Sequence, residues 1–251
     1  MANSNEEKAK EKLELANKFF DEKDYNTAEF LYTEAINLNP NLDFAYFRRG
    51  WIYGSCFDNP DRAIVEYSKH LKFNPNSDNA YNNRGREYFC LEQYDAAISD
   101  YTRAIELNPA QLFAYRNRSA AYARLKKYEA AIDDRSRNII INGASAADYN
   151  ARGWYYVKIE SYSRAISDLN KAVELDPNFS SAYDSRGWAY LGLKNYKAAL
   201  ADFNKAIEIN SEHKTSYWGR GKVYEALGEK EKADADFTAA EKLVFTEEDL
   251  N

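Results

Sequence analysis

The sequence of 251 residues is poor in the residue types that usually carry catalysis or bind metals. It holds two histidines and two cysteines, and no histidine, cysteine or carboxylate cluster has metal-ligand spacing. It also lacks a glycine-rich phosphate loop and a nucleophile elbow. We interpret His70 and His213 as structural and expect no catalytic residue, no metal and no cofactor.

Long apolar runs are absent as well. No stretch approaches the length needed to cross a bilayer, and the N-terminal MANSNEEKAKEK lacks the apolar core of a signal peptide. We interpret Cys56 and Cys90 as free thiols in a reducing compartment, although their spacing leaves a disulfide open. These features predict a cytoplasmic protein without a membrane segment.

An excess of positive charge is also missing. The net charge is −6 and the isoelectric point about 5.2. A basic surface usually drives binding to nucleic acids and anionic membranes. We therefore expect neither as a partner, although arginines and aromatic residues keep single-stranded RNA open as an alternative.

What the sequence does contain is a repeat with a period of 34 residues. The stretch Asp78–Gln111 holds two apolar runs with helical spacing, a break near Glu92–Gln93 and a terminating Pro109. Its aromatic, glycine and alanine positions recur along the chain. The tyrosines are Tyr81, Tyr115, Tyr149, Tyr183 and Tyr217, and the alanines are Ala97, Ala131, Ala165, Ala199 and Ala233. A two-helix unit of this kind buries its apolar face only by stacking on neighbours.

This pattern resembles the tetratricopeptide repeat family over residues 9–246. The resemblance implies an all-α, right-handed superhelical solenoid of seven two-helix hairpins, in which the first (A) helices line a concave groove and the second (B) helices lie outside. The expected repeats are 9–42, 43–77, 78–111, 112–145, 146–179, 180–213 and 214–246. We expect residues 1–8 to be a flexible N-terminus and residues 247–251 a tail.

Three repeats depart from the pattern. Repeat 2 holds one extra residue near Gly54–Ser55, and Pro60 stands where other repeats have Tyr, which predicts a lengthened turn. Repeat 4 has Arg135 and Asn138 at core positions. The extra capping helix that is usual in the family is missing or very short after repeat 7. Three alternatives stay open: Val244 and Phe245 are uncovered, they are covered by another chain, or the chain is a fragment of a larger protein.

An arginine and an acidic residue recur together. Repeat 1 has Leu15 and Leu31 at the two positions, so both charges are absent at once. This covariation predicts an ion pair within each later repeat, with a structural role. The predicted pairs include Arg84 with Asp100, Arg118 with Asp134, Arg152 with Asp168, and Arg186 with Asp202.

The resemblance also implies which A-helix residues face the groove. The candidates are aromatic, amide and basic side chains: Phe47, Arg48, Trp51, Asn82, Asn83, Arg86, Arg116, Asn117, Asn150, Trp154 and Trp188. Arginine grips carboxylates and asparagine bonds peptide backbone, so this set suits an extended acidic or carboxylate-bearing peptide. The alternative is that the tryptophans pack between helices and that Arg86 and Arg116 are merely solvated.

Two other functions stay open beside this non-catalytic protein-binding scaffold. A co-chaperone-like adaptor is one, since Asn117 matches the asparagine of the family's carboxylate clamp, but Asn82, Arg86, Ala147 and Ala151 leave the clamp incomplete. The other is a self-assembling structural module, joined through repeat 7 or through the outer face of repeat 4 (Arg135, Arg137 and Ile140). The protein or peptide partner stays unidentified.

Overall fold

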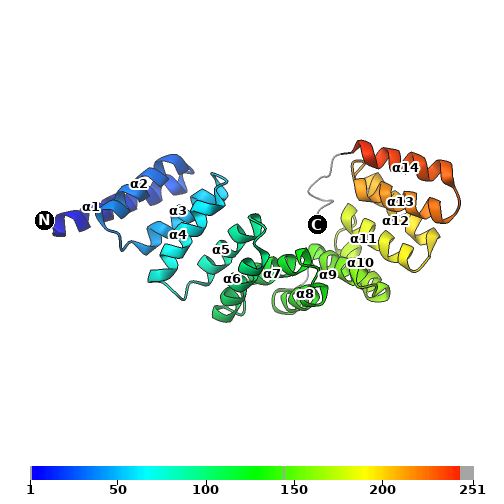
Figure 1. Cartoon of the computed structure of the whole chain (residues 1–251), viewed down its shortest axis with the longest axis horizontal. Helices are drawn as coiled ribbons and strands as arrows, with labels where there is room; N and C mark the ends of the chain where they lie inside the picture. Colours follow the sequence, from blue (N-terminus) through cyan, green and yellow to red (C-terminus); the bar gives the residue numbers. More distant parts are fainter. Residues whose placement is uncertain (1, 144, 244–251) are drawn as a thin grey trace. The chain divides into compact units, whose positions relative to one another are not determined.

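The computed structural model describes residues 2–143 and 145–243, with the side chains of residues 2–4 and 142 left aside. These residues form fourteen α-helices and no strand, in the order expected for seven hairpins (Figure 1). The all-α fold predicted from the period is thereby confirmed. The helices divide into two compact units, Met1–Leu125 and Lys126–Asn251.

The first unit holds seven helices. They are α1 (Ala2–Asp21), α2 (Tyr25–Leu38), α3 (Asp43–Ser55), α4 (Pro60–Phe73), α5 (Asp78–Cys90), α6 (Tyr94–Leu107) and α7 (Leu112–Arg124). Each helix packs against the next along the chain, and the A helix α5 also contacts the A helices α3 and α7. The A helices α3, α5 and α7 thus form one continuous row.

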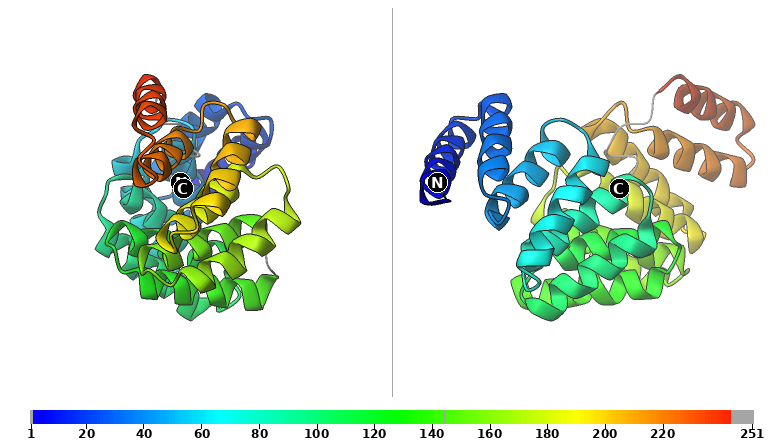
Figure 2. Two further views of the ribbon diagram at one scale, coloured as in Figure 1. Left: turned by 90° about the vertical axis from the view of Figure 1, so that its right-hand side faces the viewer. Right: turned by 60° about the vertical axis from the view of Figure 1, so that its left-hand side comes forward.

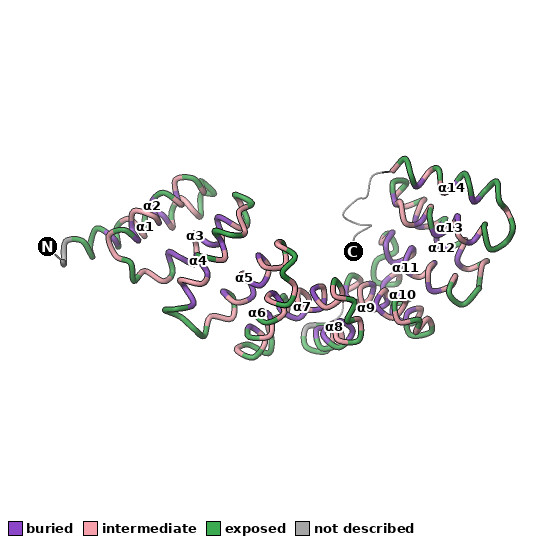
Figure 3. The backbone as a smooth tube through the Cα atoms, in the orientation of Figure 1, coloured by how far each residue is buried: buried purple, intermediate pink, exposed green. Residues whose placement is uncertain are grey.

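The second unit repeats this arrangement. Its helices are α8 (Tyr128–Asn142), α9 (Ala146–Lys158), α10 (Tyr162–Leu175), α11 (Ser180–Gly192), α12 (Tyr196–Ile209), α13 (Lys214–Ala226) and α14 (Lys230–Lys242). The A helix α11 contacts α9 and α13. Within this unit the two helices of each hairpin, α9 with α10, α11 with α12 and α13 with α14, run side by side in both views of Figure 2. Figure 3 shows buried residues on the helix sides that face neighbouring helices.

Small and large residues interlock between the helices. A Cβ on Gly187 would lie 2.7 Å from the ring of Phe203, and one on Gly153 would lie 2.7 Å from Leu169. Both large side chains are fully buried. The recurring glycine is therefore needed for close approach of the A and B helices.

The turn between helices A and B has a fixed conformation. One residue in each turn has a positive φ, the left-handed region that disfavours most side chains. These residues are Lys23, Asp58, Glu92, Lys126, Glu160, Lys194 and Gly228. In repeat 2 the turn spans residues 56–59, one residue longer than residues 91–93 in repeat 3, and α4 begins at Pro60. The lengthened turn predicted there is present, directly after Ser55.

The ends of the chain differ from the prediction in one respect. Helix α1 begins at Ala2, so residues 2–8 continue the first helix and do not form a separate segment. The reason is that this stretch has no proline or glycine and is rich in the helix formers Glu and Lys. The expected tail 247–251 and the uncovered Val244 and Phe245 lie outside the described residues.

Candidate functional site

The recurring arginines meet their acidic partners inside the repeats. Arg84 donates through Nε and Nη2 to the two carboxylate oxygens of Asp100, at 2.7 and 2.8 Å. The same paired contacts, at 2.6 to 2.8 Å, join Arg152 to Asp168, Arg186 to Asp202, and Arg220 to Asp236. In repeat 2, Nε and Nη2 of Arg49 both donate to one oxygen of Glu66, Oε2, at 2.9 and 2.6 Å. Pairing of Arg118 with Asp134, which belong to different units, stays a prediction.

Each of these arginines also reaches back to the preceding repeat, a contact that sequence reasoning missed. The remaining nitrogen, Nη1, donates to a small polar side chain sixteen residues earlier, on the previous B helix. The acceptors, at 2.6 to 3.0 Å, are Thr33, Ser68, Thr102, Ser136, Asn170 and Asn204. These acceptors recur about every 34 residues in the sequence, and this regular spacing could have predicted the contact. The guanidinium groups therefore tie consecutive B helices together and are not free for a ligand.

Repeat 4 uses its unusual residues internally. Arg135 and Asn138 both donate to Oδ1 of Asp148, at 3.1 and 3.0 Å, and Asp148 is fully buried at the start of α9. Arg135 thus lies in the contact between α8 and α9, which removes it from the outer face on which we placed it. The physical reason is that Asp148 needs buried counter-charge and hydrogen bonds. Ile140 does lie outside, 82% exposed.

The strongest candidate site of the first unit surrounds Arg48 on α3. Its guanidinium carbon lies 4.3 Å from the ring centroid of Phe20 and 5.0 Å from that of Phe44. Arg48 donates no hydrogen bond within the described part of the chain, and its buried Nε is unpaired. Trp51 packs against Phe20 in a tilted arrangement, with 5.0 Å between the ring centroids. The result is a cation held between aromatic rings with unused donors.

The other candidates of this unit are engaged with residues of the protein itself. Asn117 donates to Asn82 at 3.1 Å, and Asn82 donates weakly to Asn83 at 3.4 Å. Phe47 packs on Tyr67 with 5.7 Å between ring centroids. Arg86 donates to Glu87, its neighbour in sequence, and Arg116 also has a partner.

In the second unit the candidates are buried or half-buried. Trp188 packs edge-on against Phe203, at 5.7 Å, and so belongs to the core between α11 and α12. Trp154 carries the ammonium of Lys158 at 4.2 Å from its ring centroid, and burial lowers the pKa of Lys158. Asn150 is buried, with its side-chain oxygen unpaired.

A Ser–His–Asp set in the second unit has the wrong arrangement for catalysis. The hydroxyl of Ser216 donates to Asp184 at 2.7 Å, and His213 Nδ1 lies 3.0 Å from the same hydroxyl. Ser216 is fully buried, with no exposed surface. A substrate would not reach this hydroxyl, so the set is a buried polar contact between α11 and α13.

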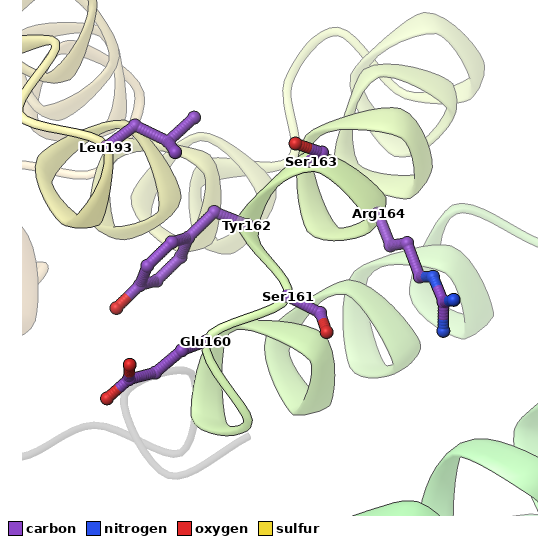
Figure 4. A pocket seen from close by; sticks show the side chains of 6 residues that line it. All are labelled: Glu160, Ser161, Tyr162, Ser163, Arg164 and Leu193. Carbon is purple, nitrogen blue, oxygen red and sulfur yellow. The ribbon is translucent and has the colours of Figure 1, made fainter.

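Neither a metal set nor an enclosed pocket stands out. Among the described residues, no group of three or more His, Cys, Asp or Glu side chains is placed to hold a metal. A shallow hollow of about 300 Å³ lies at the turn between α9 and α10. Its charged side chains, Glu160 and Arg164, point away from one another, so they do not converge on a ligand (Figure 4). No helix in the described ranges is long and apolar enough to span a membrane.

The fold and the repeated hairpin contacts define a helical repeat protein. Two models of the tetratricopeptide repeat match the sequence, one at residues 79–111 and 182–213 and the other at 149–179 and 215–243. The chain therefore belongs to the tetratricopeptide repeat family, whose members are generally non-catalytic scaffolds for protein–protein interaction. No curated protein matches it in sequence.

Several solved structures share the fold. A tetratricopeptide repeat protein from Parabacteroides merdae ATCC 43184 has a TM-score of 0.74 at 23% identity, covering 96% of this chain and 95% of that one. YrrB, a TPR protein with an unusual peptide-binding site, has a TM-score of 0.65 at 22% identity, over 74% and 95%. The MamA protein has a TM-score of 0.63 at 28% identity, over 68% and 92%.

Proposed function

We propose that the chain is a non-catalytic scaffold that binds an extended acidic or carboxylate-bearing peptide on the A helices of its first unit. The observation that carries this proposal is the set of contacts made by the Arg48 guanidinium. Its guanidinium is oriented by two aromatic rings yet bonded to no acceptor in the described residues. Buried donors usually find a partner, so an acidic group of a ligand is the natural complement.

The surroundings of Arg48 support a peptide as the ligand. Phe44 is exposed beside it, and Trp51 on the same helix packs on Phe20. Tryptophan, tyrosine and arginine are enriched among the residues that carry most of the binding energy in protein interfaces. YrrB offers a precedent for peptide binding on this fold. Free Cys56 and Cys90 fit the cytoplasmic location that we infer.

Calorimetric titration with designed peptides tests this proposal. The probes are peptides of about twelve residues that alternate Ala with Glu, Gln or Lys. We expect the Glu peptide to bind and its affinity to fall as salt rises, because the contact is electrostatic. Equal binding of the Gln peptide would contradict an acidic ligand, and binding of the Lys peptide alone would reverse the expected charge.

Self-association through repeat 4 is a second candidate, favoured by the exposure of Ile140 and, beside it, Ile141. Repeat 7 is less suited to it. Asp234 and Glu241 on α14 are exposed, at the positions of Leu200 and Ile207 on α12. Leu200 joins the cluster around Phe203 and Val223, so an apolar side chain is used where another repeat follows.

Light scattering of the wild type and of Ile140→Lys tests self-association through repeat 4. A wild-type dimer that is lost in the variant would support repeat 4, and a wild-type monomer would remove this candidate.

A further inference from the structure

Two departures from the repeat pattern meet in the first unit. Glu87 on α5 is only 1% exposed, although the equivalent residues of repeats 2 and 4 to 7 are apolar: Ile52, Ala121, Tyr155, Ala189 and Val223. Repeat 1 has a charged residue there too, Lys18, but it is exposed. Gly54 on α3 is the second departure, since the equivalent residues are Phe20, Phe89, Ala123, Val157, Leu191 and Glu225. A Cβ on Gly54 would lie 2.5 Å from Oε1 of Glu87. The chain therefore leaves space for a carboxylate where it otherwise buries apolar side chains.

The buried carboxylate is bonded to Arg86, a residue that we placed on the ligand-binding face. Nε and Nη2 of Arg86 lie 3.1 and 2.9 Å from Oε1 of Glu87, and Nη2 also donates to Ser55 at 2.9 Å. Adjacent helical residues do not normally face each other. Both side chains turn toward the end of α3, where Gly54 gives them room. The side chain of Arg86 is 41% exposed, so a ligand could reach its guanidinium, but Glu87 already neutralises the charge.

We propose that Glu87 is an internal counter-ion that withholds Arg86 from acidic ligands and leaves Arg48 as the cation that selects them. This inference rests on the proposed function, because it concerns which cation of the first unit can bind an acidic peptide. The groups that face Glu87 are Arg86 and Cys90 on α5, Asp58 before α4, Tyr67 on α4 and Tyr101 on α6. Arg86 is the only cation among them, so no other described group here replaces it as partner.

A ligand-free experiment tests the withholding directly. Phenylglyoxal modifies accessible arginines, and mass spectrometry of the digested protein gives a rate for each one. We expect Glu87→Gln to raise the rate at Arg86 several-fold and to leave exposed Arg62, on the outer helix α4, unchanged as the internal reference. Gln fills the same space without the charge. An unchanged rate at Arg86 would overturn the proposal.

Binding of the Glu–Ala peptide provides the second arm. Glu87→Gln should raise its affinity by about tenfold, the worth of one charge-assisted contact, and steepen the loss of affinity with salt. Glu87→Gln with Arg86→Gln should return the affinity to the wild-type value. If the affinity of the peptide depends on Arg48 but is the same in Glu87→Gln as in the wild type, the role of Glu87 is contradicted and the proposed function stands. Absence of any wild-type binding would defeat the proposed function, and the phenylglyoxal rates would still decide the role of Glu87.

Discussion

At the scale of single residues, the arginines of this protein have three different surroundings. Those of the recurring pairs have every guanidinium edge engaged, by an acid in their own repeat and by Ser, Thr or Asn in the preceding one. Arg86 is engaged by a neighbour in sequence, and Arg48 only by aromatic rings. Identical side chains thus serve stability in one place and are available for recognition in another.

The pair of Arg152 and Asp168 gives a prediction for stability. Arg152→Leu leaves the buried carboxylate of Asp168 without its partner, so we expect a loss of about 3–5 kcal/mol in the free energy of unfolding. Arg152→Leu combined with Asp168→Leu should lose less, because no charge remains buried. Urea unfolding of both variants measures the difference, and equal losses would contradict the structural role of the pair.

Glu87 gives a prediction for pH. Burial raises the pKa of Glu87 above its usual value of 4.5, against the opposing effect of Arg86. The folded state therefore binds this proton more tightly than the unfolded state. The resulting stabilisation is present below the usual pKa and is lost as pH rises through the raised pKa. Glu87→Gln should accordingly raise the melting temperature at pH ~7.5 and have little effect near pH ~4. A lower melting temperature of the variant at neutral pH would contradict this sign.

At the scale of elements, the turns between A and B helices hold one left-handed residue each, and six of the seven are not glycine. The exposed Lys194 has a φ of 58°, whereas the equivalent position in the last hairpin is Gly228, with a φ of 77° and open space around it. A side chain in this region carries a steric cost that glycine avoids. The hairpins thus form because tertiary packing overrides the local preference of the turn.

These two turns form a matched pair for an experiment. Lys194→Gly should stabilise the protein by up to about 1 kcal/mol, the steric relief less the added entropy of the unfolded chain. Gly228→Lys should destabilise it by a similar amount. Thermal unfolding measures the stability of both variants. If both substitutions change the stability in the same direction, a contact other than the backbone conformation governs these turns.

Helices were predictable because the period and the apolar spacing are local properties of the sequence. The lengthened turn before Pro60 followed from a count of residues. The bond from Arg86 to Glu87 was not predictable in this way, since it depends on the space above Gly54, on another helix. The same holds for Arg135, which contacts Asp148 across a turn between two repeats.

At the scale of the whole molecule, the repeat pattern predicted the fold but not the surroundings of the candidate binding residues. Family geometry placed Arg48, Arg86 and Trp188 in one set, whereas the structure holds them in an aromatic sandwich, an internal ion pair and a core contact, respectively. Equivalent positions in different repeats share a backbone place but have different neighbours. Only the neighbours decide whether a side chain is free to bind.

The most direct test of the proposed function compares two arginine variants with the wild type. Calorimetric titration with the Glu–Ala peptide should show at least about tenfold weaker binding for Arg48→Gln, which removes the unpaired cation. Arg62→Gln removes an exposed arginine that also lies over a ring, that of Tyr53, and should bind as the wild type does. Equal weakening by both variants would indicate non-specific charge attraction, and wild-type affinity in Arg48→Gln would contradict the assignment of the site to Arg48.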